Sequence, residues 1–163
     1  MMSADGGFSL LPENVQDYPR PPRLEPVQQR LRVLLGDGLV AETTRGLRAL
    51  ETHHAPTYYF PRADVLAQLI PIGGRSFCEW KGVAQYYDIA LAGQTAARAA
   101  WSYDKPSSTF APIAGYLAFY AGKMTACHVG DLRVIPQPGE FYGGWVTPNL
   151  TGRIKGAPGT RHW

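Results

Sequence analysis

Cys78 is the residue best placed along the chain for nucleophilic chemistry. It lies in the run RSFCEWKG at positions 75–82, which is typical of a turn and sets a lysine close to the thiol. A nearby cation favours the thiolate, the nucleophilic form of cysteine. His54 or His128 could act as its base if the fold brings either imidazole close. Cys78 and His54 are therefore candidate catalytic residues for thiol chemistry.

A second pattern concerns phosphoryl transfer. Gly73 and Gly74 are followed, after thirteen residues, by Asp88, which imitates the Gly-Gly turn and Asp-x-Asp strand of nucleotidyltransferases. Two carboxylates at i and i+2 of a strand share one face and can hold divalent metal ions there. Position 90 is alanine, however, and one carboxylate cannot bridge two metal ions. Asp88 is thus a catalytic candidate that lacks its partner carboxylate.

The possible metal ligands are few, and they form no metal-binding pattern. Structural zinc sites usually show pairs such as Cys-x2-Cys, and neither cysteine has such a partner. Cys127 and His128 are adjacent, so on a strand they would point to opposite faces. We therefore predict neither a metal site nor a cofactor. The side chains considered are Cys78, Cys127, His53, His54, His128 and His162.

Aromatic residues with a polar tip point to a binding site of another kind. Tryptophan and tyrosine combine a large apolar ring with one hydrogen-bonding group, which suits a pocket for a flat or amphipathic ligand. The expected ligand-binding residues are Trp80, Lys81, Tyr86, Trp101, Tyr103 and Glu51, with the two charged residues orienting the ligand at the rim. The same rings could instead fill a core between two sheets, and both interpretations stay open.

The elements that must position these residues are mainly strands. Residues 31–44 alternate apolar side chains around a Gly-Asp-Gly turn, which is a strong hairpin pattern. Further strands are predicted at 83–91 and 96–103, and one short helix at 63–70. In the strand at 96–103, alternation would place Ala97, Ala99, Trp101 and Tyr103 on one face. The fold class is mainly β, or α+β with one short helix, as a single compact domain of two packed antiparallel sheets.

Composition supports this fold class and limits the function. The 163 residues include 18 Gly and 14 Pro, with 45% hydrophobic and 18% charged residues, which excludes a disordered polar chain and a coiled coil. No apolar run approaches the length of a membrane span. The net charge of +3 comes from scattered residues and does not favour a nucleic-acid surface. Two cysteines and a start without a secretory leader make the cytoplasm the expected compartment.

Proline and glycine divide the chain into three parts. Residues 1–26 are predicted to be an extended arm, because positions 17–26 hold four prolines and favour polyproline II. Residues 27–163 form the single β-rich domain. Its tail, from residue 136 onward, is rich in Gly and Pro, and we expect it to pack as a cover. A faint echo between 33–41 and 89–97 allows a pseudo-duplication of two related β units.

Several motifs along the chain resemble those of one known family. They are DYPRPP (17–22), LET (50–52), YYFP (58–61), CEWKG (78–82), YYD (86–88), AWSY (100–103), Tyr120 and FYGGW (141–145). Over roughly residues 15–161 they resemble the bacterial and fungal family catalogued as domain of unknown function 427. The resemblance implies a compact β-rich domain of the tent-shaped, two-sheet type. It also carries over five positions as a ligand site, namely Trp80, Lys81, Tyr86, Trp101 and Tyr103. A nucleotidyltransferase label is sometimes attached to the family, and Ala90 does not support it.

These observations favour a cytoplasmic domain that binds a small molecule in an aromatic-lined pocket, without a membrane or nucleic-acid partner. Two other classes of function stay open. One is an enzyme, performing nucleotidyl transfer around Asp88 or thiol chemistry at Cys78. The other is a protein-interaction module that uses the Pro-rich arm. The ligand and the oligomeric state do not follow from the sequence.

Overall fold

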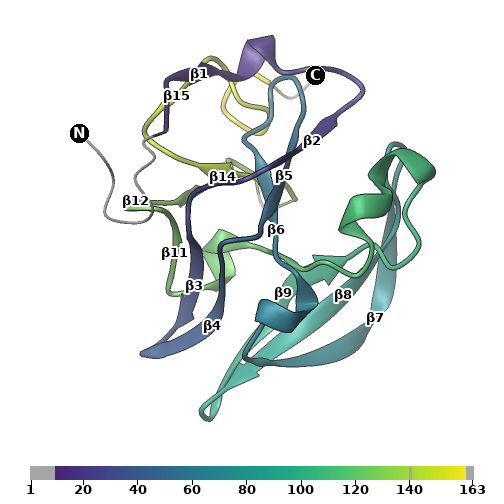
Figure 1. Ribbon diagram of the computed structural model, residues 1–163, viewed down its shortest axis with the longest axis vertical. Coiled ribbons are helices and arrows are strands. Elements are labelled where there is room, and N and C mark those ends of the chain that lie inside the picture. Colours follow the sequence, from purple (N-terminus) through teal and green to yellow (C-terminus); the bar gives the residue numbers. More distant parts are fainter. Residues whose placement is uncertain (1–9, 140, 161–163) are drawn as a thin grey trace.

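Antiparallel sheets form most of the fold, as a computed structural model of the chain shows (Figure 1). The structure describes residues 10–139 and 141–160. The first nine residues of the predicted arm and the candidate ligand His162 lie outside the described residues. The predicted fold class, mainly β with antiparallel sheets in a single compact domain, is confirmed. The described residues form three sheets and two strand pairs in place of the two sheets predicted.

Within the described residues, three sheets, two strand pairs and short 3-10 helices make up the domain. The first sheet holds, in spatial order, β10 (Ala118–Phe119), β9 (Gln94–Ser102), β8 (Gly82–Leu91) and β7 (Gln68–Cys78). The second holds β12 (Leu132–Arg133), β11 (Ala126–Val129), β3 (Leu31–Leu35) and β4 (Gly38–Thr43). The third holds β2 (Arg23–Pro26), β5 (Leu47–Leu50) and β6 (Thr57–Tyr59). The pairs are β13 (Ile135–Pro136) with β14 (Trp145–Val146), and β1 (Glu13–Asn14) with β15 (Leu150–Thr151). The helices are η1 (Val15–Asp17), η2 (Arg62–Asp64), η3 (Ser108–Ile113) and η4 (Ala121–Lys123).

The hairpins predicted from the sequence are present. Residues 31–35 and 38–43 form β3 and β4, and Gly36 in their turn has a φ of 60°. Glycine adopts this left-handed conformation without steric strain, which explains its place in the motif. The predicted strands at 83–91 and 96–103 correspond to β8 and β9, which form the centre of the first sheet.

The prediction of a short helix at 63–70 is wrong. Residues 62–64 form the 3-10 helix η2, and from Gln68 the chain is extended as β7 along β8. An isolated helix of two turns is marginal because its nucleation is unfavourable. The extended strand instead gains a ladder of hydrogen bonds with β8. The longest helical segment in the described part of the chain is η3.

A β-bulge between β8 and β9 alters one predicted face. The register of the two strands shifts between Tyr87 and Ile89. On β9, Arg98 has a φ of 48°, and its backbone N–H donates to Asp88 Oδ1 at 2.8 Å. Residues 97–99 of β9 lie opposite Asp88 alone, and extra residues of this kind interrupt the alternation of side chains. The common face predicted for the strand at 96–103 is therefore wrong at two positions. Ala97 is exposed, and Ala99 belongs to the larger core cluster, whereas Trp101 and Tyr103 belong to the second cluster.

Side chains from both faces of β8 and β9 enter hydrophobic cores. Tyr87 and Ala100 are opposite each other in the ladder, and both belong to the larger core cluster, together with Trp145. Their neighbours Tyr86 and Trp101 point the other way, into a second cluster. This follows from the two-residue period of a strand. The hairpin thus separates the two cores.

A partly buried arginine ties the N-terminal segment to the domain. Arg48 on β5 donates two hydrogen bonds to Glu13, at 3.1 and 2.9 Å, and one to Glu25 at 2.7 Å. Tyr18 donates to Glu13 at 2.5 Å. Burial alone would raise the pKa of Glu13, but the hydrogen bonds from Arg48 and Tyr18 hold it below its ordinary value. Glu13 is therefore ionised and paired at neutral pH.

Replacing Arg48 with methionine should destabilise the domain by about 2–4 kcal/mol, because two partly buried carboxylates lose their cation. Chemical denaturation of wild type and variant measures the difference. The matched control is Arg23→Met, which removes an exposed contact of 3.7 Å to the same Glu25 and should change stability by less than about 1 kcal/mol. Equal stability of R48M and wild type would contradict a stabilising network.

Candidate functional site

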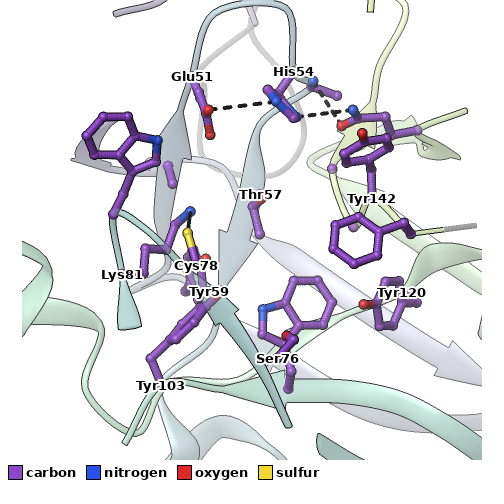
Figure 2. Close-up of a pocket in the computed structure, with 18 of the residues that line it drawn as sticks. Glu51, His54, Thr57, Tyr59, Ser76, Cys78, Lys81, Tyr103, Tyr120 and Tyr142 are labelled. Carbon is purple, nitrogen blue, oxygen red and sulfur yellow. Dashed lines mark hydrogen bonds and ion pairs between the residues drawn. The ribbon is translucent and has the colours of Figure 1, made fainter. Parts of the chain in front are cut away.

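One cavity of about 290 Å³ gathers residues from distant parts of the chain (Figure 2). Its lining includes every residue predicted to bind a ligand, namely Glu51, Trp80, Lys81, Tyr86, Trp101 and Tyr103. The catalytic candidates Cys78 and His54 also line it. The fold therefore brings these side chains together, while ligand binding by them stays a prediction.

Aromatic rings in close contact form one wall of the cavity. The centres of the Trp101 and Tyr120 rings lie 4.5 Å apart. Tyr86 is opposite Trp101 in the β8–β9 ladder, and its hydroxyl oxygen is 2.6 Å from Ser76 Oγ on β7. The Arg98 guanidinium lies 3.9 Å from the centre of the Tyr86 ring, in a cation–π contact. The wall is thus held mainly by strands.

Three phenols of the cavity stay protonated at neutral pH. Burial is the largest cause that raises the pKa values of Tyr59, Tyr103 and Tyr120 above the ordinary value. Contact with Tyr86 raises the pKa of Tyr120 further. A protonated phenol can donate one hydrogen bond and also accept. The cavity therefore offers neutral polar groups among its rings.

The C-terminal tail closes the cavity over Trp101. Gly143 leaves no room for a side chain, because a methyl group there would overlap the edge of the indole ring. Tyr142 packs its ring edge-on against His54, with ring centres 5.4 Å apart. We expected the tail to pack as a cover and not to line the site, although two glycines between aromatic residues in the motif at 141–145 could have indicated the site. The tail residues that line the cavity are Gln137, Phe141, Tyr142, Gly143, Gly144 and Lys155.

Lys81 is held inside the cavity by the turn between β7 and β8. The Ser107 N–H donates to the Lys81 carbonyl at 3.1 Å, and Ser107 Oγ donates to the Trp80 carbonyl at 2.7 Å. The next residue, Gly82, has a φ of 112°, which side chains disfavour. The Lys81 side chain is buried, and its Nζ donates to Cys78 Sγ at 3.8 Å (Figure 2). The turn thus fixes an ammonium beside a thiol.

His54 joins a hydrogen-bond network next to the tail (Figure 2). The Gln137 amide oxygen accepts from the Ala55 N–H at 3.2 Å, so the amide nitrogen, 3.3 Å from His54 Nδ1, is the donor to the ring. The proton of the neutral ring is then on Nε2, which lies 3.8 Å from Glu51 Oε2. The network therefore assigns the tautomer of His54.

The His54 ring is neutral at physiological pH. Burial, followed by the charges of Lys155 and Lys81, lowers its pKa from 6.5 to about 4, and the Glu51 carboxylate does not offset this. In the unfolded chain a histidine titrates near pH 6.5. Between pH 6.5 and 4 the unfolded chain therefore binds a proton that the folded domain does not bind. Stability must fall as the pH falls through this window.

The wild type should lose up to about 3 kcal/mol of unfolding free energy between pH 7 and 4 because of His54. The variant His54→Gln cannot bind this proton and should lose correspondingly less. Denaturation curves at a series of pH values measure both. His53→Asn is the matched control, since asparagine tolerates the φ of 65° at that position. It should keep most of the wild-type pH dependence, because His53 lowers the pKa of His54 less than burial, Lys155 and Lys81 do. A full pH dependence in H54Q would show that another group is responsible.

The structure does not place the catalytic candidates Asp88 and His128 in the cavity. Asp88 is not among the lining residues, and its carboxylate accepts the Arg98 N–H in the bulge. His128 lies on β11, in the second sheet. Cys78 and His54 both line the cavity, but each contacts other side chains. The structure therefore shows no thiol–imidazole pair among these described residues.

Residues 10–139 and 141–160 contain neither a cluster of metal ligands nor a membrane-spanning helix. There, no group of three or more His, Cys, Asp or Glu side chains is arranged to hold a metal ion. No helix in this part has the length and apolar character needed to cross a membrane. Both cysteines are free, and burial raises the pKa of Cys127 to about 12.

The fold and the site together define a β domain with an aromatic-lined cavity. The chain belongs to the family described as domain of unknown function 427 (DUF427), whose sequence model matches residues 23–130. The predicted membership is confirmed, over a shorter range than the motifs indicated. The matched range includes Lys81 and the aromatic wall, whereas the tail that closes the cavity lies outside it. No curated protein matches the chain.

Proposed function

We propose that this domain binds a small organic molecule in the cavity between β7–β9 and the C-terminal tail. The observation that carries the proposal is the convergence of rings and charges at one place. Trp101, Tyr86 and Tyr120 supply apolar surface, and Lys81 and Glu51 supply charge. Small-molecule sites typically combine a mainly aromatic lining with a few well-placed polar groups.

The volume of the cavity limits the size of the ligand. Its volume of about 290 Å³ is at the lower end of the range for small-molecule pockets, roughly 300–1,000 Å³. A compound of one or two rings is therefore the class that fits. The aromatic lining favours an aromatic or conjugated compound, because paired rings gain more than apolar burial alone.

The charged lining separates this proposal from the simpler idea of an aromatic core. Trp101 and Tyr86 are buried and do contribute to the second core cluster. A core that only fills space would not bury an ammonium group, since transfer of a charge from water into a protein is strongly unfavourable. The buried Lys81 and the partly buried Glu51 are therefore better explained by a ligand.

Replacing Trp101 with leucine should weaken the binding of compounds that stabilise the wild type. A thermal-shift screen of small aromatic and conjugated compounds identifies them, since one present at 100 times its dissociation constant adds about 2.7 kcal/mol to stability. Loss of the stacked indole should weaken binding by roughly tenfold or more. Calorimetric titration of the hits measures this change.

Phe119→Leu is the matched control for this test. Phe119 is a fully buried aromatic residue of the larger core cluster, so the variant lowers stability without altering the cavity. It should leave the affinity of each hit unchanged. The proposal fails if no compound stabilises the wild type, or if W101L and F119L change the affinities equally.

Thiol chemistry is the second candidate function, and the position of Cys78 favours it. The thiol lines the cavity and accepts a hydrogen bond from Lys81 Nζ. A ligand lying on the aromatic wall would share the cavity with this nucleophile. Nucleotidyl transfer has no comparable support, because Asp88 is outside the lining.

Iodoacetamide should modify Cys78 and not Cys127 in the native protein. Cys127 is 1% exposed, and its pKa of about 12 leaves little thiolate at neutral pH. Peptide mass spectrometry after brief alkylation locates the label, and a compound bound in the cavity should slow the reaction. Cys78→Ser is the control and should stay unlabelled. Labelling at Cys127 instead would contradict the accessibility of Cys78.

A further inference from the structure

We infer that the ligand of this cavity carries an anionic group, a carboxylate or a phosphate, which binds Lys81. The inference rests on the proposed function and specifies the class of ligand. It starts from the environment of one buried ammonium group. The Lys81 side chain is 8% exposed, faces the cavity, and is fixed by the turn before β8.

The contacts of Lys81 do not neutralise its charge. Its Nζ donates to Cys78 Sγ at 3.8 Å and lies 5.7 Å from the centre of the Phe110 ring. Sulfur is a weak hydrogen-bond acceptor, and one ring face supplies only a modest attraction. Among the described residues, no carboxylate lies within ion-pair distance of this nitrogen.

The two carboxylates that line the cavity have other partners. Glu51 lies 3.8 Å from Nε2 of the neutral His54 ring. Glu79 is exposed and lies 3.8 Å from Arg20. Lys81 is therefore a buried cation that has no carboxylate in direct ion-pair contact among the described residues.

An unpaired ammonium in a protein interior is unfavourable by several kcal/mol, which is why buried charges are almost always paired. Arg48, at another place in the same domain, follows this rule with two carboxylates. An anion that enters the cavity would give Lys81 the partner it lacks. The same anion would gain a charge-assisted hydrogen bond in a site partly shielded from water.

The other charges of the cavity agree with one anionic group on the ligand. Lys155 is a second lining cation, 5.8 Å from the centre of the Tyr142 ring. The positive charges of Lys155 and Lys81 both lower the pKa of His54, so the cavity is electropositive at that ring. Glu51 would repel a second anionic group and can accept a hydrogen bond from the ligand instead. A ring compound with a single acidic group therefore fits best.

The test compares an acid with its neutral counterpart in calorimetric titrations. Wild-type protein should bind 2-naphthoate roughly tenfold or more tightly than 2-naphthamide, because only the acid pairs with the ammonium. Lys81→Met should remove this preference and leave the affinity for 2-naphthamide unchanged. Phenyl phosphate, against phenol, gives the same comparison for a phosphate group. A preference for either anion supports the inference and identifies the group.

Lys105→Met is the matched control, since Lys105 is an exposed lysine close in sequence that does not line the cavity. It should keep the preference for the acid. A second measurement is the stability of ligand-free K81M, which should equal or exceed that of the wild type because an unpaired charge is removed. A large loss of stability would mean that Lys81 is paired within the protein, and would overturn the inference.

The remaining outcomes distinguish the two proposals. Equal binding of acid and amide by the wild type would overturn the anion inference and leave the proposed binding function standing. Binding of none of the four probes, together with an empty thermal-shift screen, would count against the proposed function itself.

Discussion

The pairing of β8 with β9 is the constraint on which both cores and the cavity depend. Opposite residues in this ladder send Tyr87 and Ala100 to one core, and Tyr86 and Trp101 to the other. At the bulge, residues 97–99 of β9 lie opposite Asp88 alone, and the Asp88 carboxylate accepts the Arg98 N–H. The register therefore changes by two residues, which keeps the faces of the paired strands on either side of the bulge, whereas a one-residue slip would exchange them.

The cavity lies where the second core, which is shared between the first and third sheets, meets irregular chain. Ala49 of β5 and Tyr59 of β6 belong to that core and also line the cavity. Its remaining sides come from the turn that carries Lys81, from the segment around His54, and from the C-terminal tail (Figure 2). The tail can approach the Trp101 ring only because residue 143 is glycine. A close backbone contact of this kind excludes larger residues by simple overlap. Apolar rings and charged groups therefore meet at a boundary between sheet and irregular chain.

Two cations, the partly buried Arg48 and the buried Lys81, show how the domain uses charge. Arg48 has two carboxylate partners and fastens the N-terminal segment to β5. Lys81 is buried at the cavity with a sulfur atom and a ring face as its contacts. The same electrostatic rule applies to both, since a charge removed from water needs an opposite charge nearby. A satisfied cation stabilises structure, whereas one without a counter-charge indicates a place for a ligand.

The local pattern of the sequence was sufficient for the hairpins, the β class and the family, because alternation and turn residues act between neighbours along the chain. It also singled out the residue types that line the cavity, such as Trp101 and Lys81. It failed where distant pairing decided the outcome: β7 replaced the helix expected at 63–70, and the bulge exposed Ala97. Only the tertiary structure shows that the tail closes the site at Gly143 and that Lys81 has no carboxylate in direct contact within the described part of the chain. Both features depend on which segments of the chain meet in space. The spacing of residues along the sequence does not specify the distances between those segments.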